Sequence, residues 1–412
     1  MHQYQAGSRN NAMSKLNLNQ IRHNLVLKHI TLNRGCTRHE AAVLSGLDKN
    51  TVNQIINDWI NWGILKESSG KKQEGKPTIG RTAVSLHISE TAPLIGGMLL
   101  KRGLLSAIIG TLDGTILKQQ DYAYSMSQVP DFIGTLCTMF EEIRKEFNQP
   151  IIGIGISSIG PVDLIHHTIS PAYFFGITNF PICQLVQQRL SIPTYLINDA
   201  NAGALTEKMW GAGKNLSDFL YIHIMNGIGA GLILDGRLHN GATGKSGEIG
   251  HTSINAFGPI CDCGNRGCLD LYTSMDSLNR RIEALEKTVP VPTRLPQVEM
   301  PNRKCSWSEL LEACDADDPL ALTTLDEFCS HLTVAVNNML KILDISTLII
   351  GYEAGGRSTV LEEMIEAHLS TNMSPGRKIT VSASHFREKS PLYGSLAVVC
   401  DKVFEGKILL CH

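Results

Sequence analysis

The chain is 412 residues long, enough for roughly two or three domains with a buried core. Hydrophobic residues make up 43% and charged residues 18%, which is typical of a globular protein and excludes a largely disordered chain. No apolar run reaches the roughly 18–20 residues of a membrane span, and the first thirty residues lack the continuous apolar segment of a secretion signal. We therefore expect a cytoplasmic protein without membrane contact, whose cysteines are free or metal-bound rather than paired in disulfides.

The formal net charge of −2 hides an uneven distribution along the chain. Residues 1–90 contain 12 Lys and Arg against 6 Asp and Glu, so this part carries +6 and the remaining 322 residues carry −8. A basic amino-terminal part predicts a polyanionic partner, and an acidic remainder predicts a different partner, small and neutral. The polar stretch of residues 1–16 is expected to be a disordered leader.

Three amphipathic helices are predicted within residues 17–63 from the spacing of their apolar residues. Thr37 and Asp48 are helix-capping residue types that precede the second and third helices. Gly46 and Gly63 follow those helices, where glycine commonly ends a helix. Two helices joined by a tight turn that contains glycine are the pattern of a helix-turn-helix.

The third helix has a polar face whose side chains are of the types that read base edges in a DNA major groove. These candidate DNA-binding residues are Lys49, Asn50, Thr51, Asn53, Gln54 and Asn57. Two short strands around a Gly- and Lys-rich loop then predict a wing, in which Gly80 and Arg81 would meet phosphates or a minor groove. The alternative is a structural three-helix domain with a solvated basic loop.

From residue 91 to residue 412 the pattern changes to strands followed by helices. Residues 94–122 predict two strands with a turn at Asp113–Gly114, and "PTYLINDANAGALTEKMWGAG" predicts a strand, a sharp turn and a helix. Strand pairs that recur before helices favour an α/β body of two similar lobes with a cleft between them.

Three of the chain's eleven cysteines lie within eight positions in "HTSINAFGPICDCGNRGCLD". Together with the preceding histidine they offer one imidazole and three thiolates: His251, Cys261, Cys263 and Cys268. This donor set suits a closed tetrahedral Zn²⁺ site, and the glycines of the loop at 251–268 let the chain curl around an ion. With four protein ligands no position stays open, so we expect one structural zinc per chain. Free cytosolic cysteines are the alternative.

The order of the motifs "GISSIGPVD", "NDANAGA", "NGIGAG", "GEIGH" and "CDCGNRGCLD" resembles the ROK family of repressors and sugar kinases. The "NLNQIR" start, the winged helix at 17–90 and the "GR" of the wing are similar to the repressor branch. The resemblance implies an actin/hexokinase-like fold at 91–412, with a sugar site between its two lobes.

The same resemblance implies that five residues face the sugar: Asn198, Asp199, Glu248, His251 and Asp270. Carboxylates accept paired hydrogen bonds from adjacent hydroxyls, so such a site discriminates against analogues that lack them. His251 would touch both zinc and sugar through its two ring nitrogens. Asp199 stands at the position of the kinase base, and its place before a helix also fits a helix cap. Asp270 replaces the Glu that is more usual in the family.

Whether the chain is a kinase depends on three elements that bind the nucleotide in the kinase branch. The "DIGGTK" of the kinases is matched by Leu99–Leu104, "NGIGAG" lacks its threonine, and the late "GG" is displaced by four positions. We therefore expect a regulator rather than an enzyme, with Asp199 as a vestigial base. The alternatives are a sugar kinase that keeps a DNA-binding domain, and a sugar-sensing module that binds no DNA.

A single recognition helix offers few base contacts, so we expect a homodimer, or a tetramer, on an inverted-repeat operator in double-stranded DNA. A sugar effector would change DNA affinity only if it binds two lobe arrangements differently. Because Glu248 and His251 belong to the zinc loop, we expect sugar binding to move that loop and the dimer interface.

Overall fold

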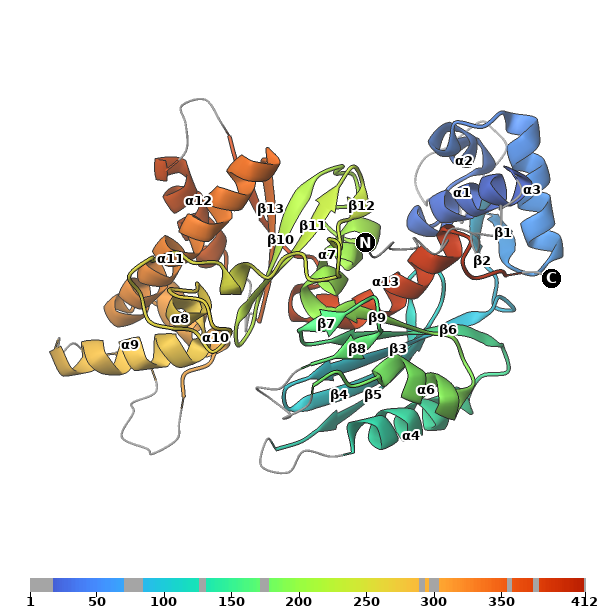
Figure 1. Ribbon diagram of the computed structural model, residues 1–412. Coiled ribbons are helices and arrows are strands. Elements are labelled where there is room, and N and C mark those ends of the chain that lie inside the picture. The colour runs from blue at the N-terminus through green and yellow to red at the C-terminus, as the bar shows by residue number, and fades with distance from the viewer. Residues whose placement is uncertain are drawn as a thin grey trace, which may run out of the picture.

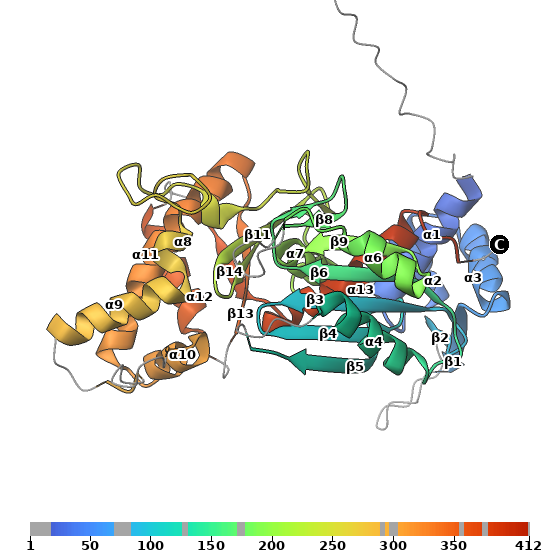
Figure 2. The same cartoon turned by 60° about the horizontal axis from the view of Figure 1, so that its bottom comes forward.

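The computed structural model describes residues 18–69, 84–125, 131–170, 178–288, 293–295, 304–353, 358–372 and 378–410. These residues form an amino-terminal winged-helix domain and an α/β body of two lobes, each built on a five-stranded sheet (Figures 1 and 2). The predicted wing loop, with Gly80 and Arg81, lies outside the described residues.

The helix boundaries of the amino-terminal domain follow from the capping residues. The Thr37 side chain accepts a hydrogen bond from the Glu40 N–H in a capping box, and Asp48 accepts one from the Thr51 N–H. Gly46 ends its helix with φ of 67°, a left-handed conformation that favours glycine. The elements are α1 (Leu18–Leu32), α2 (Arg38–Ser45), α3 (Lys49–Asn61), β1 (Leu65–Ser69) and β2 (Val84–Ile88), with β1 and β2 antiparallel.

Lobe 1 is a sheet in the order β5-β4-β3-β6-β9, with α4 packed against β4 and β5, and α6 against β9. The first three strands are antiparallel, and β3, β6 and β9 run parallel to one another. Its elements are β3 (Leu94–Lys101), β4 (Leu104–Gly110), β5 (Ile116–Ala123), α4 (Phe132–Arg144), β6 (Ile151–Ser158), β7 (Val162–Asp163), β8 (Thr168–Ile169), α6 (Ile182–Leu190) and β9 (Thr194–Asn198).

Lobe 2 repeats the same strand arrangement in the order β12-β11-β10-β13-β14. A helical layer led by the long helix α11 covers one side of this sheet. Its elements are β10 (Phe219–Ile224), β11 (Ile228–Leu234), β12 (Arg237–Leu238), η1 (Ile249–His251), α8 (Asp270–Thr273), α9 (Met275–Thr288), α10 (Trp307–Asp315), α11 (Pro319–Leu343), β13 (Thr347–Tyr352), α12 (Val360–Asn372) and β14 (Thr380–Ala383).

Two helices cross between the lobes. Helix α7 (Asp199–Trp210) follows β9 of lobe 1 but packs on β10 and β11 of lobe 2. After the short turn η2 (Arg387–Lys389), helix α13 (Ser390–Phe404) follows β14 of lobe 2 but packs on β3 and β6 of lobe 1. The two helices also pack against each other, so they form the joint of the body (Figure 1).

The prediction of two strands across residues 94–122 was wrong, because three strands occupy this stretch. A two-residue turn at Arg102–Gly103 separates β3 from β4, since Lys101 pairs with Leu104. Gly103 has φ of 77°, which glycine adopts at no steric cost. The apolar runs on both sides of this turn hid it, because they resemble one long buried strand.

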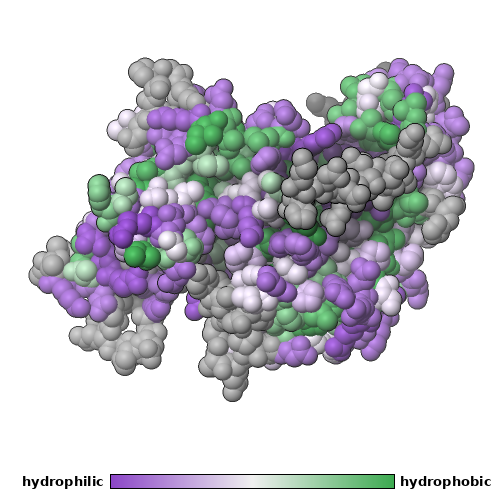
Figure 3. Space-filling model, in the orientation of Figure 1, coloured by the Kyte–Doolittle hydropathy of each residue, from purple (hydrophilic) through white to green (hydrophobic). Residues whose placement is uncertain are grey.

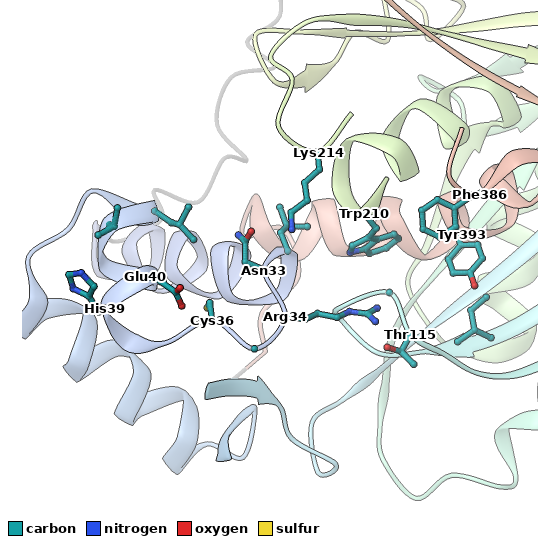
Figure 4. A pocket seen from close by; sticks show the side chains of 16 residues that line it. Asn33, Arg34, Cys36, His39, Glu40, Thr115, Trp210, Lys214, Phe386 and Tyr393 are labelled. Carbon is teal, nitrogen blue, oxygen red and sulfur yellow. The ribbon is translucent and has the colours of Figure 1, made fainter. Parts of the chain in front are cut away.

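The amino-terminal domain shares one continuous hydrophobic core with lobe 1 and α13. Val52 and Ile56 of the domain belong to the same cluster of buried residues as Leu396 and Val399 of α13. Above this contact lies an open groove of about 1030 Å³ between the domain and the body (Figure 4). None of the described helices is long and apolar enough to cross a membrane, and hydrophilic residues dominate much of the described surface in Figure 3.

Candidate functional site

A cleft of about 350 Å³ opens between the two lobes of the body. The five residues expected to face a sugar all line it: Asn198, Asp199, Glu248, His251 and Asp270. They come from four separate segments, the β9–α7 junction, the turn before η1, η1 itself and the start of α8. The fold therefore brings together residues that are up to about seventy positions apart in the sequence.

The β9–α7 junction fixes Asn198 and Asp199 at the floor of the cleft. The cap of α7 is Asn198, whose Oδ1 accepts hydrogen bonds from the Ala200 N–H at 3.0 Å and the Asn201 N–H at 3.4 Å. Asp199 is the first helical residue, and its Oδ1 accepts from the Ala200 N–H at 2.8 Å. The cap position is thus taken by Asn198, and the Asp199 side chain remains partly open to the cleft.

Glu248 and Asp270 supply the opposite wall from lobe 2. Asp270 Oδ1 accepts a hydrogen bond from the Ile228 N–H at 2.9 Å, which ties α8 to the start of β11. Within the described residues, no donor reaches the Glu248 carboxylate, so its oxygens are available to a ligand. A half-buried carboxylate with open acceptor positions suits recognition of hydroxyl groups.

Burial raises the pKa values of all three acids, and a neighbouring negative charge adds to the rise for Asp199 and Glu248. Burial raises the pKa of Asp199 to about 7, and the negative charge of Glu248 adds to the rise. Burial also raises the pKa of Glu248, helped by Asp270, and burial raises the pKa of Asp270 itself. A cleft that concentrates perturbed carboxyl groups is a candidate functional site on physical grounds.

Lys101 and His223, which the sequence did not single out as site residues, line the cleft as well. Lys101 is the last residue of β3, and burial lowers its pKa against the pull of Glu353, Glu388 and Asp199. Burial, with the Lys101 charge as a second cause, lowers the pKa of His223 to about 3, so that imidazole is neutral.

The metal-ligating atoms of His251, Cys261, Cys263 and Cys268 lie within 4.8 Å of one another. The Cys261 Sγ is 3.7 Å from His251 Nδ1, and the Cys263 Sγ is 3.6 Å from the Cys268 Sγ. Zn–S bonds of about 2.3 Å at tetrahedral angles place two sulfur atoms about 3.8 Å apart. The four residues therefore have the donors and the spacing to hold a metal ion, and His251 Nδ1 is the nitrogen that faces the thiols.

Glycines let the loop close around this cluster. Gly264 and Gly267 have φ of 89° and 66°, and a Cβ on Gly267 would lie 1.8 Å from the Asn255 carbonyl oxygen. The Asn265 side chain donates to the His251 carbonyl oxygen at 3.0 Å, which fixes the histidine backbone. Burial raises the pKa of the Cys268 thiol to about 12, so an ion that binds there must displace its proton.

Helix α3, which carries the candidate DNA-binding residues, lies at the outer edge of the molecule (Figure 1). The exposed ones are Lys49, Asn50, Asn53, Gln54 and Asn57. Thr51 is instead half-buried, and its hydroxyl bonds the Asp48 carboxylate at 2.5 Å. Arg38 of α2 donates to Asn57 Oδ1 at 2.8 Å and to Asn53 Oδ1 at 3.4 Å, a tie between the two helices that the sequence did not reveal.

Comparisons with known proteins agree with this architecture. The chain is 28% identical over 398 residues to the xylose repressor of Caldicellulosiruptor bescii, a match that covers 93% of this chain and 96% of that protein. Among solved structures it is similar to a ROK family transcriptional regulator homologous to the Escherichia coli MLC protein, with a TM-score of 0.76, 23% identity, and coverage of 94% and 97%.

The body alone is similar to enzymes. A ROK family glucokinase from Streptomyces griseus, solved with glucose and AMPPNP, matches with a TM-score of 0.65 and 22% identity, covering 74% of this chain and 98% of the glucokinase. The family profile of ROK matches residues 102–402, which is more than half of the chain. On this evidence the protein belongs to the ROK family.

Proposed function

We propose that this protein is a sugar-responsive transcriptional regulator, a repressor, that binds double-stranded DNA through α3 and its wing. One observation carries the proposal: a helix-turn-helix domain and a cleft lined by sugar-binding residue types occur in one chain. The xylose repressor of C. bescii, similar along nearly the whole length, supports the same function. Its name indicates carbohydrate genes as targets and a sugar as effector.

The sugar would bind between Asp199 of the β9–α7 junction and Glu248 of lobe 2. Its hydroxyls would donate to the carboxylates and accept from Asn198 and from His251 Nε2. Because these groups lie on both lobes, a bound sugar would favour the closed arrangement over the open one. In this scheme the acids recognise the effector and no bond of the sugar is broken.

We assign the metal site to one zinc ion per chain, held by His251 Nδ1 and three thiolates. The set of one imidazole and three sulfur donors, with no open position, is that of structural zinc. The ion would stiffen the loop that carries His251 and neighbours Glu248, so it would preorganise one wall of the cleft. We also propose that the protein acts in the cytoplasm as a homodimer on an inverted repeat, or as a tetramer.

An ATP-dependent sugar kinase is the second candidate, and one observation favours it. Asp199 stands at the base position with a pKa raised by burial to about 7, which suits proton abstraction near neutral pH. Against it, the family resemblance matches Lys101 and Arg102, two residues that line the cleft, to the two glycines of the kinase phosphate loop. A coupled assay of ADP release with a panel of sugars decides between the two, and we expect no turnover above background.

The direct test of the regulator is DNA binding with and without sugar. Full-length protein is used to select binding sites from a pool of random duplexes, and the selected duplex is titrated by fluorescence anisotropy. The sugar panel contains neutral pentoses and hexoses, N-acetylhexosamines and their phosphates. We expect selection of an inverted repeat and a change in its affinity with at least one sugar. Binding that is equally tight to every duplex, with no sugar effect, contradicts the proposal.

A further inference from the structure

Helices α7 and α13 both begin at the sugar cleft. Asn198 caps α7 and Asp199 is its first residue, while Glu388 of η2 and Pro391 in the first turn of α13 line the same cleft. The helices then run side by side in close contact, because a Cβ on Gly394 of α13 would lie 2.4 Å from the Cβ of Ala202. A sugar that draws the lobes together therefore acts on the first turns of both helices.

Helix α13 reaches the amino-terminal domain directly, and α7 ends at the groove between that domain and the body. Trp210, the last residue of α7, packs over Gly114 in the β4–β5 turn, where a Cβ would lie 2.6 Å from the indole ring. Asp113 of that turn forms an ion pair with Arg34 of the amino-terminal domain, with Nε and Oδ2 3.2 Å apart. Trp210 and Arg34 face the same groove in Figure 4, and α13 packs against α1.

Glu207 of α7 is a completely buried carboxylate at the junction of the two helices, with 0% exposure. Its Oε1 accepts hydrogen bonds from the Ser384 hydroxyl at 2.6 Å, the Phe386 N–H at 3.3 Å and the Ser390 hydroxyl at 3.4 Å. Its Oε2 accepts from the Ala212 N–H at 2.7 Å and the His385 N–H at 3.3 Å.

A second contact, next to Glu207, also joins α7 to α13. The Thr206 hydroxyl donates to the Ser390 carbonyl oxygen at 2.8 Å and shares its proton with the Ala202 carbonyl oxygen of its own helix at 2.9 Å, so it joins α7 to the first residue of α13. Removing one partner of a buried hydrogen-bonded carboxylate leaves unsatisfied groups behind, so this junction resists separation. Residues 384–390, which connect β14 of lobe 2 to α13, are therefore hydrogen-bonded to Thr206 and Glu207 of α7.

We infer that Glu207 is a positioning residue, which makes α7 and α13 move as one body and so transmits sugar-dependent lobe movement to the DNA-binding domain. The inference rests on the proposed function and concerns how its two sites communicate. It differs from transmission by the zinc loop, which packs within lobe 2 through η1 and β11. Glu207 touches neither the cleft nor the groove, so its effect must pass through the helices that it joins.

Glu207→Gln tests this junction with little change in shape. With the amide oxygen at the Oε2 position, the Ala212 and His385 N–H groups keep their acceptor. The amide nitrogen then faces two serine hydroxyls that can rotate to accept. The variant removes the carboxylate acceptor of the Phe386 N–H, which keeps the Ser384 hydroxyl at 3.2 Å as its other acceptor, and it removes the charge. Thr206→Val is an independent variant that removes the tie to the Ser390 carbonyl, and Thr206→Ser restores the hydroxyl.

Thr324→Val is the matched control for the loss of a buried threonine hydroxyl. Thr324 is equally buried, but its hydroxyl bonds only the Leu320 carbonyl of its own helix α11, at 2.8 Å. All variants are full-length protein. For each we measure the sugar Kd by calorimetry without DNA, the Kd for the selected duplex without sugar, and the ratio of DNA Kd values with and without sugar.

We expect the wild type, Thr206→Ser and Thr324→Val to share one ratio, within the range of about 5- to 150-fold typical of allosteric coupling. Glu207→Gln and Thr206→Val should bring the ratio towards 1 while each separate Kd changes less than about threefold. If both variants keep the wild-type ratio of DNA Kd values, the inference is wrong. It is also wrong if the variants lose sugar affinity by as large a factor as they lose this ratio. Neither result affects the proposed function. A wild type without any sugar effect overturns the proposed function and the inference with it.

Discussion

Arg34 of the amino-terminal domain binds Asp113 of lobe 1 twice, once through the carboxylate at 3.2 Å and once through the carbonyl oxygen at 2.6 Å. Arg34 lines the groove between domain and body together with Gly114 and Thr115, which follow Asp113 in the chain (Figure 4). About half of the Arg34 side chain is exposed, and exposed pairs contribute roughly 0–1 kcal/mol to stability. The contact therefore sets the orientation of the domain more than it stabilises the fold.

Arg34→Ala should lower the free energy of unfolding by less than about 1 kcal/mol, yet reduce the effect of sugar on DNA affinity. The reason is that the domain keeps its hydrophobic contact with lobe 1 but no longer has its polar tie to the turn beneath Trp210. Urea unfolding and duplex titration measure the two effects. Lys118→Ala is the control, because it removes an exposed pair with Glu146 inside lobe 1. Equal sugar effects in the two variants would contradict this role of Arg34.

Cys263→Ser should abolish stoichiometric metal binding. Purified wild type is expected to contain about one zinc per chain. Loss of one of the four ligands should lower the free energy of unfolding by several kcal/mol, which is part of the roughly 10–16 kcal/mol that binding of a structural zinc supplies in small domains. Mass spectrometry of the metal and thermal unfolding are the measurements. Asp262→Ser, beside the ligand but not among the four, should retain the zinc. Wild type without metal and with three freely titrating thiols would rule out the site.

Gln54→Ala and Asn53→Ala should weaken binding to the selected duplex and relax base preference, by about 1–3 kcal/mol for each bidentate hydrogen-bonded pair with a base that the variant removes. Asn53 shares its amide oxygen with Arg38, so its variant should also loosen α2 against α3. Arg81→Ala in the predicted wing should lower affinity more evenly across sequences. Gln188→Ala, exposed on α6 of lobe 1, is the control. If all three variants bind like that control, α3 is not the recognition helix.

The helix boundaries of the amino-terminal domain could be predicted from the sequence, because capping is local chemistry. Thr37 and Asp48 cap α2 and α3 as expected. The grouping of the metal ligands could also be predicted from the sequence, because three of them lie within eight positions and only one loop has to close. The sugar-facing acids came from the family resemblance, because nothing in their spacing indicates that Glu248 and Asp199 share a cleft.

The sequence could not show how the two lobes exchange their helices. Helix α7 packs on the sheet of lobe 2, which follows it in the chain, and α13 packs on the sheet of lobe 1, which lies far earlier in the chain. The hydrophobic periodicity of a helix does not indicate which sheet it covers. Glu207 was missed for the same reason, since a single acid in "ALTEKMW" looks like a solvent-facing residue. Its hydrogen-bond donors lie mostly between Ser384 and Ser390, about 180 residues away in the chain.

Asp199→Asn should change how stability depends on pH. The folded-state pKa of Asp199 is raised to about 7 from its usual 3.8, so folding favours the protonated acid. The resulting stabilisation is complete below about pH 4 and is lost as the pH rises through 7. The asparagine variant should therefore gain stability relative to wild type by an amount that grows as the pH rises from about 4 to about 7 and is constant above, as measured by urea unfolding. Asp121→Asn, exposed on β5, is the control, and a pH-independent difference for Asp199→Asn would contradict the assignment.

The most direct test of the account is a titration of the selected operator duplex with wild type and Glu248→Ala, each with and without the responding sugar. Glu248 faces the cleft and has no role at α3, so the variant should bind the duplex as tightly as wild type. Wild type should change its DNA affinity by about 5- to 150-fold with sugar, and Glu248→Ala should show almost no change. A normal response in Glu248→Ala, or no sugar response in wild type, would contradict a regulator that reads its effector in this cleft.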